Sequence, residues 1–184
     1  MTRNLSRETL DAGLDEVRRA PRDAGALKLI VRRPETGARE VLDVGELDPV
    51  EGLVGDNWKT RGSAGTPDGS AHSEMQLNVM NSRAIALIAQ TEERWALAGD
   101  QLFVDLDLSE QNLPVGTRLG IGSAAIEVTP PPHAGCQKFV ERFGVDAMKW
   151  VNSEIGRGLR LRGLNAKVVQ AGVIYAGDTV TKIA

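Results

Sequence analysis

Apolar residues recur along the chain with two spacings, one typical of strands and one typical of helices. Short apolar runs bounded by Gly, Pro and Asp predict β-strands. These runs are ALKLIVRR, AREVLDV, MQLNVM, QLFVDLDL, TRLGIG, AAIEVTP, AKVVQAGVIYAGD and TVTKIA. PETG joins the first two, and its Pro34 and Gly37 favour a turn, so we expect a hairpin there. Short strands separated by frequent turns predict a closed or strongly bent sheet.

The N-terminal stretch LSRETLDAGLDEVRRAP predicts an amphipathic helix. Ser6 can cap it, Leu10, Leu14 and Val17 share one face, and Pro21 ends it. Such a helix either packs on the rest of the domain or forms an oligomer contact, and the pattern favours neither.

Helical spacing returns in NSRAIALIAQTEERWALA, which Asn81 or Ser82 can cap, and in the shorter pieces CQKFVERF and DAMKWVNSE. Gly144 is placed to end the first of these short pieces. Residues 52–74 are mostly Gly, Ser, Thr and Asp, which predicts a long irregular loop. We therefore expect an N-terminal appendage over residues 1–22 and a mainly β domain with a few helices over residues 23–184.

Composition narrows the class of protein. The chain has 184 residues, 41% of them apolar, 26% charged, with a net charge of −3. A slightly negative net charge does not favour nucleic-acid binding. No apolar run approaches the roughly 18 residues of a membrane span, and the start MTRNLSRETLDAG lacks an apolar signal core. We expect a soluble, cytoplasmic protein that binds neither nucleic acid nor membrane.

The one cysteine, Cys136, excludes an internal disulfide and a Cys-rich zinc site. It stands in PPPHAGCQKFVERFG, where prolines end the strand ladder and Gly135 permits a sharp turn. This places the thiol at a helix start, whose positive end favours the thiolate. Lys138, Arg142 and His133 lie close enough in sequence to add to this effect.

An inert Cys136 is the alternative, since free cysteine is often a small buried apolar residue. A zinc site is a weaker one, because His133 and Cys136 supply only two ligands and nothing in the sequence brings His72 to them.

GRGLRLRG places Arg157, Arg160 and Arg162 in one short run, and arginine forks suit phosphate oxygens. On a strand, Arg160 and Arg162 would share one face and could bind a ligand together. Alternatively, they are solvated charges on an edge strand that prevent aggregation. Asp105 and Asp107 alternate with apolar residues in VDLDL. They either face a pocket together or form the solvent-exposed face of a strand.

These motifs, in this order, resemble the MOSC domain, the C-terminal domain of eukaryotic molybdenum cofactor sulfurases. The segments that carry the resemblance are GLVGD, SEQNLPVG, the strand pair LGIGSAAIEVT, PPPHAGC and LRGLNAKVVQAGVIYAGDTV. The resemblance spans about residues 26–183. It implies a β-barrel related to the β domain of pyruvate kinase.

The resemblance also implies site residues. Cys136 corresponds to the family cysteine that carries sulfane sulfur or coordinates molybdenum. Asp56 falls in the family's Gly-Asp turn, and Glu110 and Asn112 fall in its Glu-Asn-Leu turn, here with an inserted Gln111. The predicted cofactor-binding residues are Asp56, Asn112, Arg142, Arg160 and Arg162. Cys136, His133 and Lys138 are the predicted catalytic residues, and Cys136 is the predicted metal ligand.

The implied cofactor is the molybdenum cofactor. Pyridoxal phosphate is linked to the family only through a partner, a cysteine desulfurase, because this chain has no desulfurase domain. Its length also leaves no room for the additional N-terminal β domain of the family's two-domain molybdenum reductases.

Three functions stay open. The protein is a sulfurtransferase or molybdenum-dependent oxidoreductase that uses Cys136 on an anionic substrate, with a desulfurase or electron-donor protein as partner. It is a noncatalytic module that binds a small ligand or a partner, with Cys136 in the core. Or it detoxifies N-hydroxylated bases, as the resemblance to bacterial members of the family implies.

Overall fold

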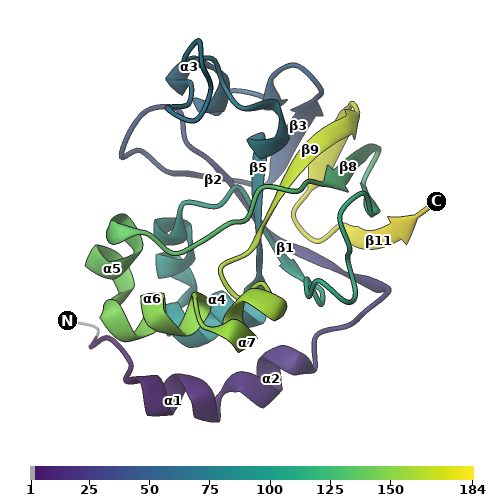
Figure 1. The fold of residues 1–184 in the computed structure, drawn as a ribbon. Coiled ribbons are helices and arrows are strands. Elements are labelled where there is room, and N and C mark those ends of the chain that lie inside the picture. Colours follow the sequence, from purple (N-terminus) through teal and green to yellow (C-terminus); the bar gives the residue numbers. More distant parts are fainter. Residues whose placement is uncertain (1–2) are drawn as a thin grey trace.

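A closed β-barrel forms the centre of the computed structural model, which describes residues 3–184 (Figure 1). Seven strands close the ring, and the eighth strand of the sheet, β2 (Glu40–Leu42), pairs with β1 outside it. In ring order the seven are β1 (Ala24–Arg32), β11 (Thr179–Ile183), β7 (Arg118–Ile121), β8 (Ala124–Val128), β9 (Leu164–Gln170), β5 (Leu77–Asn81) and β6 (Leu102–Asp105). Among these described strands β5 and β6 are parallel, and every other neighbouring pair is antiparallel.

Strand β1 closes the barrel because it is long enough to pair with three others. Its first residues pair with β11, its middle with β6 and its last residues with β2, with an irregularity between Leu27 and Leu29. Gly25 permits the close approach to β6, since a Cβ there would lie 1.8 Å from the carbonyl oxygen of Asp105. The predicted hairpin between β1 and β2 is confirmed, with Gly37 at a φ of 91°.

A second, three-stranded sheet lies beside the barrel. It consists of β10 (Gly172–Tyr175), β3 (Val44–Asp48) and β4 (Gly52–Leu53). The loop predicted over residues 52–74 is irregular only in part, because it contains β4, the short helix α3 (Trp58–Arg61) and the 3-10 turn η1 (Ser73–Met75).

Helices gather on one side of the barrel (Figure 1). They are α1 (Arg7–Ala12), α2 (Leu14–Arg18), α4 (Ser82–Ala89), the 3-10 helix η2 (Glu92–Ala98), α5 (Gln137–Phe143), α6 (Val145–Val151) and α7 (Glu154–Gly158). Helix α1 packs on α6 and α2 packs on α4, so the N-terminal segment packs on the domain.

Two hydrophobic cores follow from the two-residue period of the strands. In β6, Leu102 and Val104 point into the barrel, whereas Phe103 points outward into a core shared with the helices. This second core holds Leu10 of α1 and Trp150 of α6, both buried. Because both faces of β6 are buried, its sequence is continuously apolar rather than alternating.

The predicted fold class, a mainly β barrel with a few helices, is confirmed, and the differences concern individual helices. The N-terminal helix is capped by Ser6 as predicted but divides at Gly13 into α1 and α2. The helix predicted after β5 is capped by Asn81, ends at Gln90 with a φ of 68°, and resumes as η2. The strand predicted for GRGLRLRG is wrong, because these residues form α7 and the turn after it.

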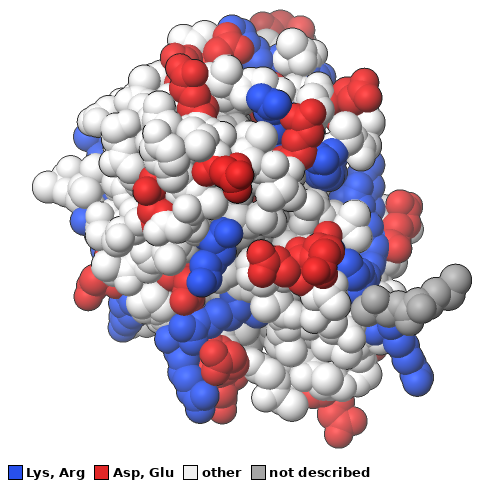
Figure 2. All heavy atoms as spheres, turned by 180° about the vertical axis from the view of Figure 1, so that it is seen from behind, with Lys and Arg blue, Asp and Glu red and all other residues white. Residues whose placement is uncertain are grey.

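Charges are mixed over the molecule. Figure 2 shows basic and acidic side chains interspersed on one face, with neither sign dominating. Within the described residues, every helix is too short or too polar to cross a bilayer.

Candidate functional site

Cys136 is the N-cap residue of α5, with an extended backbone, and its side chain is exposed. The chain leaves β8 through the proline run and turns into α5, which Phe139 and Phe143 anchor in the helical core with their rings 4.9 Å apart. Gly144 ends the helix as predicted. The alternative in which Cys136 is a buried core residue is therefore wrong.

The thiol lies at a cavity of about 390 Å³, which we name the cysteine pocket. Its walls come from α5, from the turn after β1, from α3 and from the end of η2. Six of the lining side chains are cationic, against the two carboxylates Glu35 and Glu141. The cationic residues are Arg33, Arg39, Arg61, Lys138, Arg142 and Arg162.

Asp56 forms an ion pair with Arg33 that holds this arginine in place, and both side chains are buried. The guanidinium donates through Nε and Nη2 to the two carboxylate oxygens at 2.9 and 2.8 Å. Asp56 also accepts from the backbone N–H of Trp58 at 3.0 Å. Because its oxygens are occupied in this way, Asp56 acts on the pocket through Arg33 rather than by lining it.

A second buried carboxylate, Asp100, holds Arg162 and His133 together. Arg162 Nη1 donates to Asp100 Oδ2 at 2.6 Å, and His133 Nε2 donates to Oδ1 at 3.0 Å. Arg162 also lies over the ring of Phe139, 5.0 Å from its centroid. This network fixes Arg162 against the first turn of α5, next to the thiol.

Charges within this network displace the pKa values of its members. Burial alone would raise the pKa of Asp100, but the positive charge of Arg162 and the hydrogen bonds outweigh it and lower the pKa to about 2. Burial, and then the charge of Arg162, lowers the pKa of His133. His133 is therefore neutral near pH 7, and its predicted role beside the thiol becomes a role in orienting Asp100 and Arg162.

Arg39, Arg61, Lys138 and Arg142 have no carboxylate within 4.0 Å in the described part of the chain. Burial and then the neighbouring charges of Arg142 and Arg33 lower the pKa of Arg39. Burial and then Arg33 lower the pKa of Arg61 in the same way. Guanidinium groups that repel one another across a cavity make that cavity attractive to an anion.

Two buried polar atoms on the wall of the cysteine pocket have no hydrogen-bond partner within residues 3–184. They are Asn57 Oδ1 and Arg162 Nε. Buried polar atoms in folded proteins are nearly always paired, and an unpaired one costs roughly 1–3 kcal/mol. Both residues line the cysteine pocket, so polar atoms that the described chain leaves unpaired lie just behind its wall.

The structure brings together Cys136, Lys138, Arg142 and Arg162 of the predicted site residues, and it places two others elsewhere. Asn112 donates to the carbonyl oxygens of Arg22 and Asp107 and accepts from Lys182 at 2.7 Å, so it fastens a turn against the barrel. Arg160 donates to the carbonyl oxygens of Leu108 and Leu113 and lines a different cavity.

The two aspartates of VDLDL do not face a common pocket. Asp105 accepts from Arg83 at 2.7 Å, and Asp107 accepts from the backbone N–H of Ser109. His72 accepts from the backbone N–H of Glu74 at the start of η1. Over residues 3–184, no three His, Cys, Asp or Glu side chains lie close enough to hold a metal ion.

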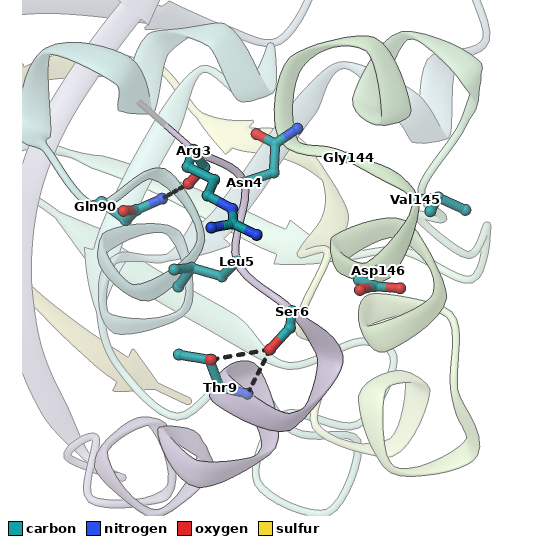
Figure 3. A pocket seen from close by; sticks show the side chains of 9 residues that line it. All are labelled: Arg3, Asn4, Leu5, Ser6, Thr9, Gln90, Gly144, Val145 and Asp146. Carbon is teal, nitrogen blue, oxygen red and sulfur yellow. Dashed lines mark hydrogen bonds between the residues drawn. The ribbon is translucent and has the colours of Figure 1, made fainter. Parts of the chain in front are cut away.

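Another hollow, of about 610 Å³, lies between the N-terminal segment and the start of α6 (Figure 3). Its polar side chains serve the chain itself, since Ser6 accepts from the backbone N–H of Thr9 and Gln90 donates to the carbonyl oxygen of Arg3. The chemistry-bearing residues lie at the cysteine pocket instead.

Five contributors to the cysteine pocket were not predicted from the sequence, namely Arg33, Arg39, Asn57, Arg61 and Asp100. One signal was present for the buried carboxylates. Asp56 and Asp100 each follow a glycine with positive φ, 83° at Gly55 and 89° at Gly99. A third such pair, Gly177–Asp178, has a φ of 97° at its glycine and forms a turn instead, so the Gly-Asp pair alone does not identify the pocket.

The fold and the site define a class of protein, a closed β-barrel with an exposed cysteine at a cationic pocket. Comparison with known proteins identifies the family. The family model of the MOSC domain matches residues 66–181, so the chain belongs to the MOSC domain family. No curated protein matches the chain. The matched residues include Cys136 but not the arginines before residue 66.

Solved structures share the fold. The YuaD protein from Bacillus subtilis is 18% identical with a TM-score of 0.58, and the match covers 85% of this chain and 94% of that one. YiiM from Escherichia coli is 19% identical with a TM-score of 0.53, covering 86% and 70%. YiiM from Geobacillus stearothermophilus is 13% identical with a TM-score of 0.52, covering 89% and 74%.

Proposed function

We propose that the cysteine pocket binds a molybdenum cofactor of the pterin-phosphate type and that the protein is the cofactor-binding part of an oxidoreductase. One observation carries the proposal: the exposed thiol of Cys136 shares its pocket with four cationic side chains that have no carboxylate within 4.0 Å in residues 3–184. The MOSC domain family is associated with this cofactor.

The residues of the pocket fit such a group. The forks of Arg39, Arg61 and Arg142 suit the oxygens of a phosphate, because a guanidinium can donate two parallel hydrogen bonds. Arg33 and Arg162 are held in place by Asp56 and Asp100, which offset their charges, so they shape the wall of the pocket.

Cys136 would provide the metal ligand as a thiolate, which soft metals prefer among protein ligands. The ammonium group of Lys138 lies on the same pocket. When bound, the cofactor would supply two-electron oxidation and reduction. The protein's part is to bind its anionic end, to offer one sulfur ligand and to leave the exposed side of Cys136 open to a substrate.

The substrate that we propose is an N-hydroxylated base. Its reduction breaks the N–O bond and, with two electrons and two protons, yields the N–H compound and water. The electrons would come from a donor protein.

Sulfur carriage by Cys136 is the second candidate, and the exposure of the thiol favours it. A desulfurase that delivers sulfane sulfur must bring its own persulfide to the acceptor thiol, which requires an accessible acceptor. In that case the cationic pocket would bind an anionic sulfur acceptor.

The experiment is to express the full chain in cells that make the molybdenum cofactor and to purify it anaerobically. Molybdenum per chain would be measured by elemental analysis, and the mass of the peptide that contains Cys136 would reveal an added sulfur atom. We expect molybdenum in the wild type and its loss in Cys136→Ser. Arg61→Gln should retain less cofactor, and the exposed Arg118→Gln should match the wild type.

Equal molybdenum in Cys136→Ser and wild type would refute the role of the thiol as a metal ligand. A sulfur adduct on Cys136 without molybdenum would instead support sulfur carriage. The loaded protein should also convert an N-hydroxylated base to the reduced base when supplied with electrons, and failure of that assay alone would refute only the substrate.

A further inference from the structure

A second cavity, of about 130 Å³, lies on the other side of Arg162 from the cysteine pocket. We name it the arginine-turn pocket, because Arg157, Arg160 and Arg162, from α7 and the turn after it, line it together. The proline run, His133 and Glu110 complete the lining. Neither candidate function uses Arg157 or Arg160.

Arg160 has an unusual backbone for its residue type. Its φ is 48°, in the left-handed region where glycine and asparagine are favoured. A residue held in this conformation points to a role for its side chain. Arg160 Nη1 donates to the carbonyl oxygens of Leu108 and Leu113. Among the described residues, its Nε and Nη2 atoms donate to no protein acceptor, so they are available to a ligand.

Positive charge exceeds negative charge around this pocket. The titratable groups that line it are Glu110, His133 and the three arginines. Asp100 balances Arg162, and burial keeps His133 neutral, which leaves Arg157 and Arg160 against Glu110 alone. Burial lowers the pKa of Arg160, and the carboxylate of Glu110 only partly opposes this. The pocket therefore favours an anion.

The proline wall does not oppose an anion. The carbonyl oxygens of Pro131 and Pro132 accept from Asn165 Nδ2 at 2.9 and 3.3 Å, so they are directed to that buried amide. The Nε and Nη2 atoms of Arg160, in contrast, donate to no protein acceptor within residues 3–184. The pocket thus combines unused donors with acceptors that are already occupied.

The volume limits the size of the ligand. The arginine-turn pocket has about a third of the volume of the cysteine pocket, 130 against 390 Å³. The smaller cavity suits a compact ligand such as a tetrahedral oxyanion. We propose that the arginine-turn pocket binds a small inorganic oxyanion such as sulfate or phosphate through Arg157, Arg160 and Arg162. This site shares Arg162 with the proposed cofactor site, but Arg157 and Arg160 lie outside that site, so the proposal stands without it.

Selenate, a tetrahedral oxyanion with an anomalous signal, tests the location. Crystals of the full chain would be soaked in sodium selenate, and the anomalous peak is expected among Arg157, Arg160 and Arg162. In solution, thermal denaturation would be followed against sulfate at constant ionic strength maintained with chloride. A specific site gives a saturable rise in melting temperature, unlike the general, non-saturating effect of sulfate on proteins.

Arg160→Gly is the sharpest variant, because glycine adopts the left-handed backbone without strain while the guanidinium is lost. We expect roughly ten-fold weaker sulfate binding, the effect of losing a charge-assisted hydrogen bond. Arg157→Gln, on an exposed helix end, gives a second variant that keeps the fold. Arg118→Gln, on an exposed strand, is the control and should bind sulfate as the wild type does. Arg61→Gln reports any sulfate that binds at the cysteine pocket instead.

The absence of a selenate peak from the arginine-turn pocket would overturn the proposal. So would an unchanged saturable sulfate response in both Arg160→Gly and Arg157→Gln. Loss of that response in Arg61→Gln would assign the anion effect to the cysteine pocket and would equally overturn it.

Discussion

Asp100 is the residue whose surroundings explain most about the site, although it does not line the cysteine pocket. It is fully buried and binds a guanidinium and an imidazole at once. Removing one partner of a buried ion pair leaves the other charge without compensation, which costs about 3–5 kcal/mol. The carboxylate therefore stabilises the wall between the two pockets.

We predict that Asp100→Asn lowers the free energy of unfolding by about 3–5 kcal/mol, because Arg162 stays buried without its counterion. Urea denaturation measures this directly. Asp15→Asn, which removes an exposed carboxylate paired with Arg18, is the matched control and should change the free energy little. Similar small effects of both substitutions would mean that Arg162 is not stabilised by the charge of Asp100.

His133 makes stability depend on pH in the mildly acidic range. Because burial lowers its pKa, the unfolded chain binds more protons than the folded chain once the pH falls below about 6.5. Stability should therefore be fully present above pH 6.5 and decline as the pH falls towards the lower pKa of the folded state. His133→Gln should flatten this decline, as measured by urea denaturation between pH 5 and 7, whereas His72→Gln should retain it.

At the scale of elements, short-range signals explain what could be predicted. Ser6, Asn81 and Gly144 act within three residues of the helix ends that they define, so their roles are visible in the sequence. Helix α7 could not be predicted in this way. Its glycines and alternating arginines favoured a strand, and its formation depends on Gly156, where a Cβ would meet the carbonyl oxygens of α6.

The two candidate caps of α4 can be separated by substitution. Asn81 accepts from the backbone N–H groups of Arg83 and Ala84 and donates to the carbonyl oxygen of Leu106. We predict that Asn81→Ala costs about 1–2 kcal/mol of stability, the usual effect of losing an N-cap. Ser82→Ala should cost about 0.5 kcal/mol or less. A larger loss for Ser82→Ala than for Asn81→Ala, measured in urea, would reverse the assignment.

At the scale of the whole molecule, contacts between distant segments explain what could not be predicted. The pairing of Arg33 with Asp56 spans 23 residues, that of His133 with Asp100 spans 33, and that of Arg162 with Asp100 spans 62. Nothing local marks such a partner. The barrel, in contrast, is predictable because strand patterns and turns are local. The position of Cys136 at a helix start is also predictable, because the prolines and Gly135 precede it directly. The arginine cluster was not predictable.

The N-terminal helices belong to the same folded unit as the barrel. Leu10, Leu14 and Val17 are buried in the core that also holds Trp150. Burying a leucine or valine side chain contributes about 1.5–3 kcal/mol, so the three together contribute a large part of a typical stability of about 5–15 kcal/mol. We therefore predict that a chain beginning at Pro21 loses solubility or shows a much lower midpoint in urea.

Leu10→Ala in the full chain is the matched variant for this truncation. It removes one buried side chain and leaves both helices in place, and it should cost about 2–5 kcal/mol. If the loss arises from the shared core, the truncated chain should also expose the aromatic residues of α5 and α6, which the fluorescence of Trp150 and the binding of a hydrophobic dye would report. A truncated chain with the urea midpoint and Trp150 emission of the full chain would show instead that residues 1–20 are a separable appendage.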